Sequence, residues 1–528
     1  MVALDYHDET KHHFTRFARA LGYLDWATQP EPFRRYAGAP FEPLSRAALT
    51  DAVPYAALFD GSAPAAPMTR ESIGELLRCS MGLSAWKQYG ASRWALRVNP
   101  SSGNLHPTEA YVAAEAQVWH YAPREHGLEA RCRLDGAAWM EWMAPDSGGA
   151  AFLVALTSIH WREAWKYGER AFRYCQHDAG HAIAALRLAA ALLGWRLALL
   201  PRWSDAQVGT LLGLDRDADF SDAEREEPEC VAVVAAGDPA WWIERDPAGL
   251  VEAAGRGTWH GTANRLSASR EEWPIIDEVA AATQYPGDSP SPPRPVASSP
   301  PRPVAPSHQT DLRARSVILQ RRSAVAFDAE SALSRDAFVT MLRRLRPPSP
   351  PWDAIDWPPQ VHLALFVHRV AGLVPGLYAC LRDPAVLPEW KGAMRTEFLW
   401  EPVDELFLLA PFDGRRLANR VSCDQAIAED GFFSLGMIAR VEPAVRERGE
   451  WFYRRLYWEC GLVGQVLYLE AETTGGRATG IGCFYDDPMH EVLGLTGRAW
   501  QSLYHFSMGV AVEDTRLTTE PGYPWERR

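Results

Sequence analysis

The sequence has no closely spaced pair of cysteines, because its eight cysteines are never nearer to one another than 23 residues. A C-x-x-C motif is therefore missing, which argues against a zinc ribbon or a thioredoxin-type redox site. In a chain of 528 residues, such dispersed cysteines are typical of buried thiols in a reducing compartment. We expect a cytoplasmic protein with no bound metal.

An excess of basic residues is also missing. The 54 Lys and Arg residues are outnumbered by 67 Asp and Glu residues, which gives a net charge of −13. Binding to a nucleic-acid backbone requires a basic surface, so we expect no nucleic-acid partner.

Neither a secretory signal nor a membrane span is visible. The first residues, MVALDYHDETKHHF, contain no apolar core of a signal peptide. The longest apolar stretch, residues 182–200, contains Arg187 and Arg196, and each would cost roughly 2.5–3.5 kcal/mol at a bilayer centre. We expect a buried helix followed by a strand there, and no membrane partner.

Three motifs that would indicate a nucleophile, a metal site or a dinucleotide site are incomplete. Ser84-Ala-Trp-Lys87 fits the S-x-x-K motif of penicillin-binding enzymes, but the accompanying S-D-N and K-T-G motifs are absent. His177 and His181 could share a helix face, yet H-E-x-x-H is absent, so helix packing explains them better than a metal does. Gly480-Ile-Gly482 lacks the third glycine of a dinucleotide-binding motif.

Proline is concentrated in one segment, in which the hexapeptide PPRPVA occurs at 292–297 and again at 300–305. Such a density prevents helix and sheet formation and favours an extended spacer, with a ligand for an SH3-type domain as the alternative. We predict a linker at 286–309 that separates an N-terminal domain, 1–285, from a C-terminal domain, 310–528.

The two predicted domains share a pattern of glycines and apolar runs. Three glycine pairs recur at one offset of 281 residues: Gly180 and Gly461, Gly194 and Gly475, Gly213 and Gly494. Each half is predicted to contain a long buried helix, a stop at glycine, a short strand, and a short helix ending in L-G-L. A strand-like run precedes this unit in each half, at 110–121 and at 361–378. The pattern indicates a duplicated α+β domain.

Two polar segments are suited to binding a ring-shaped ligand. Asn99-Pro-Ser-Ser-Gly-Asn104 combines a rigid proline and two hydroxyls with a glycine that permits close backbone approach, although a simple tight turn has the same composition. Arg321-Arg322-Ser323 offers guanidinium groups and a hydroxyl that suit a phosphate.

These segments together resemble the nitroreductase superfamily of FMN flavoproteins, and in particular its azoline dehydrogenase (thiazoline oxidase) branch. RRSAVAF at 321–327 is similar to the family's opening R-R-S element, and ATGIGCF at 478–484 to the strand end beside the flavin. RVNPSSGNLHP at 97–107 resembles the branch's P-S-x-G loop. KYGERAFRYCQHDAGH at 166–181 resembles its K-Y-G…E-x-G-H helix, with Asp178 in the place of Glu.

The resemblance implies two nitroreductase-like domains in one chain that form an intramolecular pseudo-dimer. Family members bind FMN at a dimer interface, where one subunit supplies R-R-S, the strand end and a C-terminal basic residue, and the other supplies P-S-S. The implied cofactor-binding residues of one composite FMN site are Pro100, Ser101, Ser102, Gly103, Arg321, Arg322, Ser323, Gly482, Cys483 and Arg516. The first half lacks an R-R-S element and the second lacks a P-S-S loop, so we expect one flavin per chain.

The resemblance also implies hydride transfer to or from FMN, with Lys166 and Tyr167 as catalytic residues. At the aligned positions the second half has Glu447 and Arg448. Oxidation of azolines in a peptide is the first expectation, with a small-molecule or peptide substrate and partner proteins of peptide modification. One alternative is NAD(P)H-dependent reduction of nitro compounds or quinones. The other is a flavin-free pseudoenzyme that binds a peptide or a partner protein.

Overall fold

The computed structural model of the chain describes residues 1–143, 150–287 and 312–526. The chain forms two large antiparallel sheets. The strand order is β11-β7-β6-β5-β8-β10-β9 in the first half, with β2 paired to β7, and β15-β16-β14-β13-β17-β19-β18 in the second. The first sheet consists of β2 Phe41–Pro43, β5 Thr108–Ala114, β6 Gln117–Ala122, β7 Gly127–Arg133, β8 Ala151–Ser158, β9 Arg196–Leu199, β10 Glu227–Ala235 and β11 Thr258–Trp259. The second consists of β13 Val361–Val367, β14 Gly376–Cys380, β15 Glu401–Val403, β16 Leu406–Pro411, β17 Phe433–Arg440, β18 Arg477–Ile481 and β19 Trp500–Gly509.

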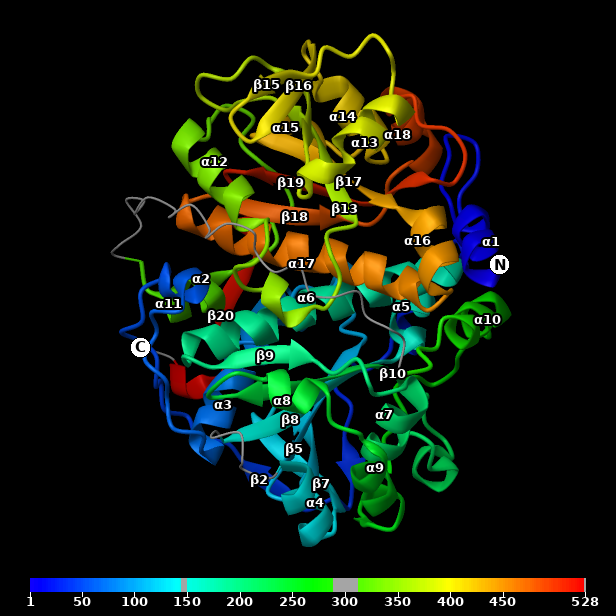
Figure 1. Ribbon diagram of the computed structural model, residues 1–528, viewed down its shortest axis with the longest axis vertical. Coiled ribbons are helices and arrows are strands. Elements are labelled where there is room, and N and C mark those ends of the chain that lie inside the picture. Colours follow the sequence, from blue (N-terminus) through cyan, green and yellow to red (C-terminus); the bar gives the residue numbers. More distant parts are fainter. Residues whose placement is uncertain (144–149, 288–311, 527–528) are drawn as a thin grey trace.

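Two long helices, α6 Ala171–Leu192 and α17 Phe452–Thr473, lie against each other between the sheets (Figure 1). Every residue of α6 is buried, including the polar side chains of its first half, and its second half is rich in Ala and Leu. The remaining helices are α1 Val2–Glu9, α2 Ala57–Asp60, α3 Arg70–Arg78, α4 Gly136–Met143, α5 His160–Tyr167, α7 Asp205–Leu212, α8 Ala240–Ile243, α9 Ala248–Gly255, α10 Pro274–Ala282, α11 Ala314–Gln320, α12 Arg335–Arg344, α13 Leu387–Ala393, α14 Arg415–Val421, α15 Ile427–Asp430, α16 Val441–Arg448 and α18 Asp486–Leu493.

The predicted order of helix, glycine, strand and helix is present in both halves. Shortly after α6 and α17 come Gly194 and Gly475, whose φ angles are +67° and +74°, and the short strands β9 and β18 follow them. Next come α7 and α18, which end at Gly213 and Gly494 in the left-handed conformation typical of helix C-caps.

The strand-like runs are hairpins, which corrects the expectation of one strand in each. In the first half β5 turns into β6 at Glu115 and Ala116, two non-glycine residues with φ of 54° and 57°. No Gly or Pro marks this turn, so the sequence carried no signal for it. In the second half, β13 and β14 divide the run 361–378 in the same way. Ser334 caps the N-terminus of α12, since its Oγ accepts a hydrogen bond from the Ala337 amide at 3.3 Å.

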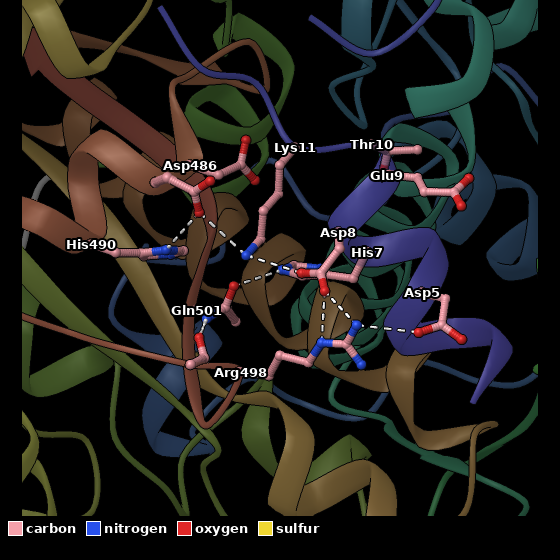
Figure 2. A network of polar contacts seen from close by, with 12 residues as sticks. Asp5, His7, Asp8, Glu9, Thr10, Lys11, Asp486, His490, Arg498 and Gln501 are labelled. Atoms are coloured by element: carbon pink, nitrogen blue, oxygen red, sulfur yellow. Dashed lines mark hydrogen bonds and ion pairs between the residues drawn. The ribbon is translucent and has the colours of Figure 1, made fainter. Parts of the chain in front are cut away.

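Each end of the chain contacts the opposite half. Near the N-terminus, Asp8 binds Arg498 (Figure 2), and Lys11 Nζ lies 3.3 Å from Asp487 Oδ1 of α18. Near the C-terminus, β20 Thr518–Pro521 pairs with β3 Leu83–Tyr89, which in turn pairs with β4 Ser92–Arg97. A further small sheet joins β1 Tyr36–Ala37 to β12 Thr262–Ala263.

The α+β fold class is confirmed. The domain boundaries stay predictions, and the predicted linker at 286–309 lies outside the described residues except for residues 286 and 287. Within the described ranges, none of the helices has both the length and the apolar character needed to cross a bilayer.

Candidate active site

A cavity of about 440 Å³ lies where segments from the two halves meet. This volume falls in the range of small-molecule and cofactor sites. The first half supplies the loop after β4 and the end of α5, and the second half supplies the segment after α11 and the end of β18. The structure thereby brings most of the expected site residues to one cavity: Pro100, Ser101, Ser102, Gly103, Tyr167, Arg321, Arg322, Ser323, Gly482 and Cys483.

Hydrogen bonds to Asp178 of α6 fix the loop after β4. The backbone N–H of Ser102 donates to Asp178 Oδ1 at 3.0 Å, and the Ser102 hydroxyl donates to the same oxygen at 3.1 Å. The Ser101 hydroxyl accepts from the His106 amide at 2.7 Å. Asp178 is buried, and desolvation raises its pKa to about 7 despite these hydrogen bonds. The loop therefore rests on a carboxyl group that titrates near neutral pH.

The Lys166–Tyr167 pair faces this same loop. A Cβ atom on Gly103 would lie 2.6 Å from the Tyr167 hydroxyl and 3.2 Å from Lys166 Nζ, so a side chain at position 103 would collide with both. The Tyr167 ring packs on the Tyr174 ring, with centroids 4.3 Å apart. Burial raises the pKa of Tyr167 well above its usual value, which keeps the hydroxyl protonated. Sequence alone could not place this pair relative to the R-R-S segment, and the structure puts Tyr167 and that segment in the wall of one cavity.

Arg321 and Arg322 bring positive charge to the cavity wall. Arg321 donates from Nε to the Val98 carbonyl at 2.9 Å, while its buried Nη1 has no hydrogen-bond partner among the described residues. Arg322 donates from Nη2 to the Ser84 carbonyl at 2.6 Å. Within the described part of the chain, neither guanidinium is within ion-pair distance of a carboxylate, and desolvation lowers the pKa of both groups, that of Arg322 to about 9. An anion at this wall would relieve the cost of burying these charges.

Close approach of aromatic rings explains the glycines at the end of β18. A Cβ atom on Gly482 would lie 2.0 Å from a ring carbon of Tyr174, and one on Gly480 would lie 1.8 Å from the Tyr504 hydroxyl. Beside them, the Ser323 hydroxyl lies 3.0 Å from the Tyr468 hydroxyl. The strand end is therefore packed tightly against aromatic side chains from both halves.

Two of the expected site residues lie elsewhere. The Arg516 side chain is largely exposed, pairs with Asp514 at 2.8 Å and is not part of the cavity wall. Lys166 is not in the wall either, although its Nζ would lie 3.2 Å from a Cβ atom on Gly103, which does line the cavity. Residues that sequence reasoning did not assign to the site also line it: Lys87, Tyr174, Asp178, Gln425, Tyr468 and Tyr504. The sequence singled out Lys87 and Asp178 only as parts of the S-x-x-K motif and of the segment 166–181, and it gave no signal for the tyrosines, which most often serve packing.

The S-x-x-K serine and the His177–His181 pair, which the sequence did not favour as catalytic or metal sites, have structural roles. The Ser84 hydroxyl donates to the Arg97 carbonyl at 3.1 Å between strands β3 and β4. His177 Nε2 lies 3.0 Å from the Leu503 carbonyl, and His181 Nε2 lies 3.3 Å from the Tyr504 hydroxyl. Both histidines are buried at the contact of α6 with the second half.

Comparison with known proteins supports the fold. Residues 64–223 match the model of the nitroreductase family. A candidate nitroreductase of Anabaena variabilis aligns over 97% of this chain and 99% of its own, with a TM-score of 0.68 at 22% identity. The E. coli microcin synthetase McbBCD complex with truncated pro-MccB17 bound aligns over 37% of this chain and 70% of its own, with a TM-score of 0.26 at 20% identity. A candidate nitroreductase of Ralstonia eutropha aligns over 42% and 90%, with a TM-score of 0.25 at 16% identity.

The chain matches no curated protein sequence. The Anabaena structure shows that the nitroreductase-type fold extends over nearly the whole chain. The resemblance to the nitroreductase family is thus confirmed for residues 64–223, while the azoline dehydrogenase branch and the tandem fusion stay predictions.

Proposed function

We propose that the protein is an FMN-dependent oxidoreductase that transfers two electrons as a hydride. The observation that carries this proposal is the meeting of four segments, Pro100–Gly103, Tyr167, Arg321–Ser323 and Gly482–Cys483, at one cavity of about 440 Å³. The nitroreductase match at residues 64–223 supports the same chemistry.

The chemistry of the cavity wall fits FMN. The unpartnered Nη1 of Arg321 and the guanidinium of Arg322 are suited to the phosphate, because charge-assisted hydrogen bonds to phosphate are strong and bidentate. The hydroxyls of Ser101 and Ser323 offer further polar contacts. When bound, FMN would supply an acceptor or donor for the hydride.

We propose further that the two halves pair around this one site as a pseudo-dimer. Support comes from the division of the wall, since the P-S-S loop belongs to residues 1–285 and the R-R-S segment to residues 310–528. One flavin per chain follows, because each element occurs in only one half.

Oxidation of an azoline in a peptide is the reaction that the Lys166–Tyr167 pair favours. Losing a hydride from the azoline ring also requires a base that takes a ring proton. Because the buried Tyr167 hydroxyl stays protonated, it orients the substrate by hydrogen bonding, and Lys166 takes the proton at Nζ. A reductase that receives its hydride from NAD(P)H needs no such base. The Lys166–Tyr167 pair therefore distinguishes azoline oxidation from nitro or quinone reduction.

The first test is the absorption spectrum of the purified protein together with the amount of FMN released per chain. Bands of oxidised flavin and one FMN per chain are expected. A flavin-free protein that also fails to bind added FMN would overturn the proposal in favour of a peptide-binding pseudoenzyme. Two FMN molecules per chain would contradict the single composite site.

The second test compares substrates. The flavin-loaded protein should convert a thiazoline-containing peptide to the thiazole, detected by mass spectrometry as the loss of two hydrogens. Activity confined to a nitroaromatic substrate with NADPH would show a reductase instead.

A further inference from the structure

Two cysteines that are 60 residues apart in sequence meet at the edge of the cavity. The Sγ atoms of Cys423 and Cys483 lie 3.1 Å apart, and His12 Nδ1 lies 3.8 Å from Cys483 Sγ. Cys483 follows β18 and lines the cavity, while Cys423 follows α14. Both are only partly buried, so small molecules can reach them. The sequence has no C-x-x-C spacing that would indicate the pair, because the two thiols lie on separate loops that the fold brings together.

Hydrogen bonds and ion pairs of the surrounding residues hold His12 and the two cysteines in place. The His12 amide donates to Asp486 Oδ2 at 2.8 Å, and the Asp486 amide donates to the His12 carbonyl at 3.0 Å. Arg170 and Arg173 bind the Asp486 carboxylate at 2.9 and 2.8 Å. The neighbouring contacts of Lys11 and α1 with the second half fix the N-terminal segment in the same place (Figure 2).

The two thiols differ in acidity. Contact with the Cys423 thiol lowers the pKa of Cys483, and His12 and the Arg170 charge act in the same direction, while contact with Cys483 and burial raise the pKa of Cys423. The other six cysteines, Cys79, Cys132, Cys175, Cys230, Cys380 and Cys460, have pKa values raised by burial. Cys483 is therefore the thiol in this chain that is suited to attack as a thiolate.

We propose that Cys423 and Cys483 form a reversible dithiol–disulfide pair that reacts with small-molecule disulfides at the wall of the cavity. The Cys483 thiolate attacks one sulfur of RS–SR, which breaks that S–S bond, releases RS⁻ and leaves a mixed disulfide on Cys483. Cys423, after losing its proton, attacks Cys483 Sγ and releases the second RS⁻. Two electrons pass from the protein to the small disulfide, and the two thiol protons end on two RSH molecules.

Geometry and charge favour this reaction over a metal site at the same three residues. Two thiolates bound to a tetrahedral zinc ion at about 2.3 Å would lie about 3.8 Å apart, which exceeds the 3.1 Å observed. The Arg170 guanidinium, which donates to the Gly482 carbonyl at 3.3 Å, adds a positive charge beside the group. A cation would be repelled there, whereas a thiolate is stabilised.

The test equilibrates the reduced full-length protein with mixtures of reduced and oxidised glutathione, blocks free thiols with an alkylating agent, and maps the cysteine-containing peptides by mass spectrometry. The two cysteines should lose alkylation together and appear as one disulfide-linked pair. Cys423→Ser should instead accumulate glutathione on Cys483. Cys483→Ser should slow the first reaction about tenfold or more, whereas Cys230→Ser, at another partly buried cysteine, should leave it unchanged.

The outcome does not depend on the proposed flavin chemistry, because the reaction can be followed on flavin-free protein. A wild-type protein in which glutathione stays on Cys483 without closure of the disulfide would overturn the proposal. So would one equivalent of tightly held zinc that protects Cys423 and Cys483 from alkylation, since that result would identify a metal site.

Discussion

Gly180 of α6 and Gly461 of α17 face each other where the two central helices cross. A Cβ atom on Gly180 would lie 2.2 Å from the Trp458 carbonyl oxygen, and one on Gly461 would lie 2.4 Å from the His177 carbonyl oxygen. These positions are also one of the pairs separated by 281 residues. The repeat in the sequence thus corresponds to a contact between the halves, in which two glycines allow the backbones to touch.

Gly461→Ala should destabilise the protein. The added methyl group overlaps backbone atoms of α6, which must move apart, and overpacking of this kind costs about 1–3 kcal/mol. The free energy of unfolding in denaturant measures the effect. The matched control is Gly209→Ala in α7, where a Cβ atom meets nothing within 4 Å, and helix propensity predicts a gain of about 0.5–1 kcal/mol. Equal effects of the two variants would show that the helix crossing is not tightly packed.

The order of elements was predictable because local signals specify it. Glycines after apolar helical runs, and Ser334 before α12, act through backbone conformation and capping within a few residues. The turn at Glu115 and Ala116 was not predictable, since the residues there are not those that usually adopt positive φ. The meeting of Cys423 with Cys483 also had no local signal, because it depends on how two distant loops pack.

Arg322→Ala should weaken FMN binding. Loss of a charge-assisted hydrogen bond costs about 1.5–3 kcal/mol, or roughly ten- to a hundredfold in affinity. Fluorescence titration of the apoprotein measures it, and riboflavin, which lacks the phosphate, should bind wild type and variant alike. Arg516→Ala is the control, because that exposed side chain lies outside the cavity and should leave FMN affinity unchanged. An equal loss for FMN and riboflavin would argue against a phosphate contact.

The raised pKa of Asp178 predicts that the free energy of unfolding depends on pH. Its pKa is about 7 in the folded protein, above the ordinary value of 3.8. Between pH 4 and 7 the unfolded chain has released this proton while the folded protein still holds it, so rising pH favours unfolding. Above the folded pKa the whole penalty applies, on the order of 4 kcal/mol for a shift of about three units.

Asp178→Asn removes this titration and keeps an acceptor for Ser102. The unfolding free energy of the variant relative to wild type should therefore rise with pH between about 4 and 7 and level off above. Denaturant titrations at a series of pH values give this difference, in which the other ionisable groups largely cancel. A difference that stays flat with pH would show that Asp178 ionises normally in the folded protein.

The composition of the site was predictable only through family resemblance. Motifs at 97–107, 166–181 and 321–327 indicated a flavin site, but each alone is compatible with a turn, a packed helix or a solvated segment. Spacing along the chain could not show that Tyr167 and Arg321 line one cavity, because the packing of the two halves decides it. For the same reason, the position of Arg516 outside the cavity was not foreseen.

Lys166→Ala should lower turnover of a thiazoline peptide by roughly 10²–10⁴ while FMN stays bound, because general-base catalysis contributes about that much. Lys166 Nζ approaches Gly103 at the cavity, whereas Lys391 of α13 is exposed elsewhere, so Lys391→Ala is the matched control and should keep full activity. Tyr167→Phe should have a smaller effect, since the protonated hydroxyl orients the substrate and accepts no proton.

The activities of Lys166→Ala, Tyr167→Phe and the control Lys391→Ala are measured on the thiazoline peptide and on a nitroaromatic with NADPH, at equal flavin content. A merely structural role of Lys166, in which its aliphatic part covers apolar surface, would reduce both activities together or release FMN. Loss on the peptide alone, with the reductase activity retained, is the outcome expected for a base. Full activity of Lys166→Ala on the peptide would contradict the base assignment and favour the reductase reaction.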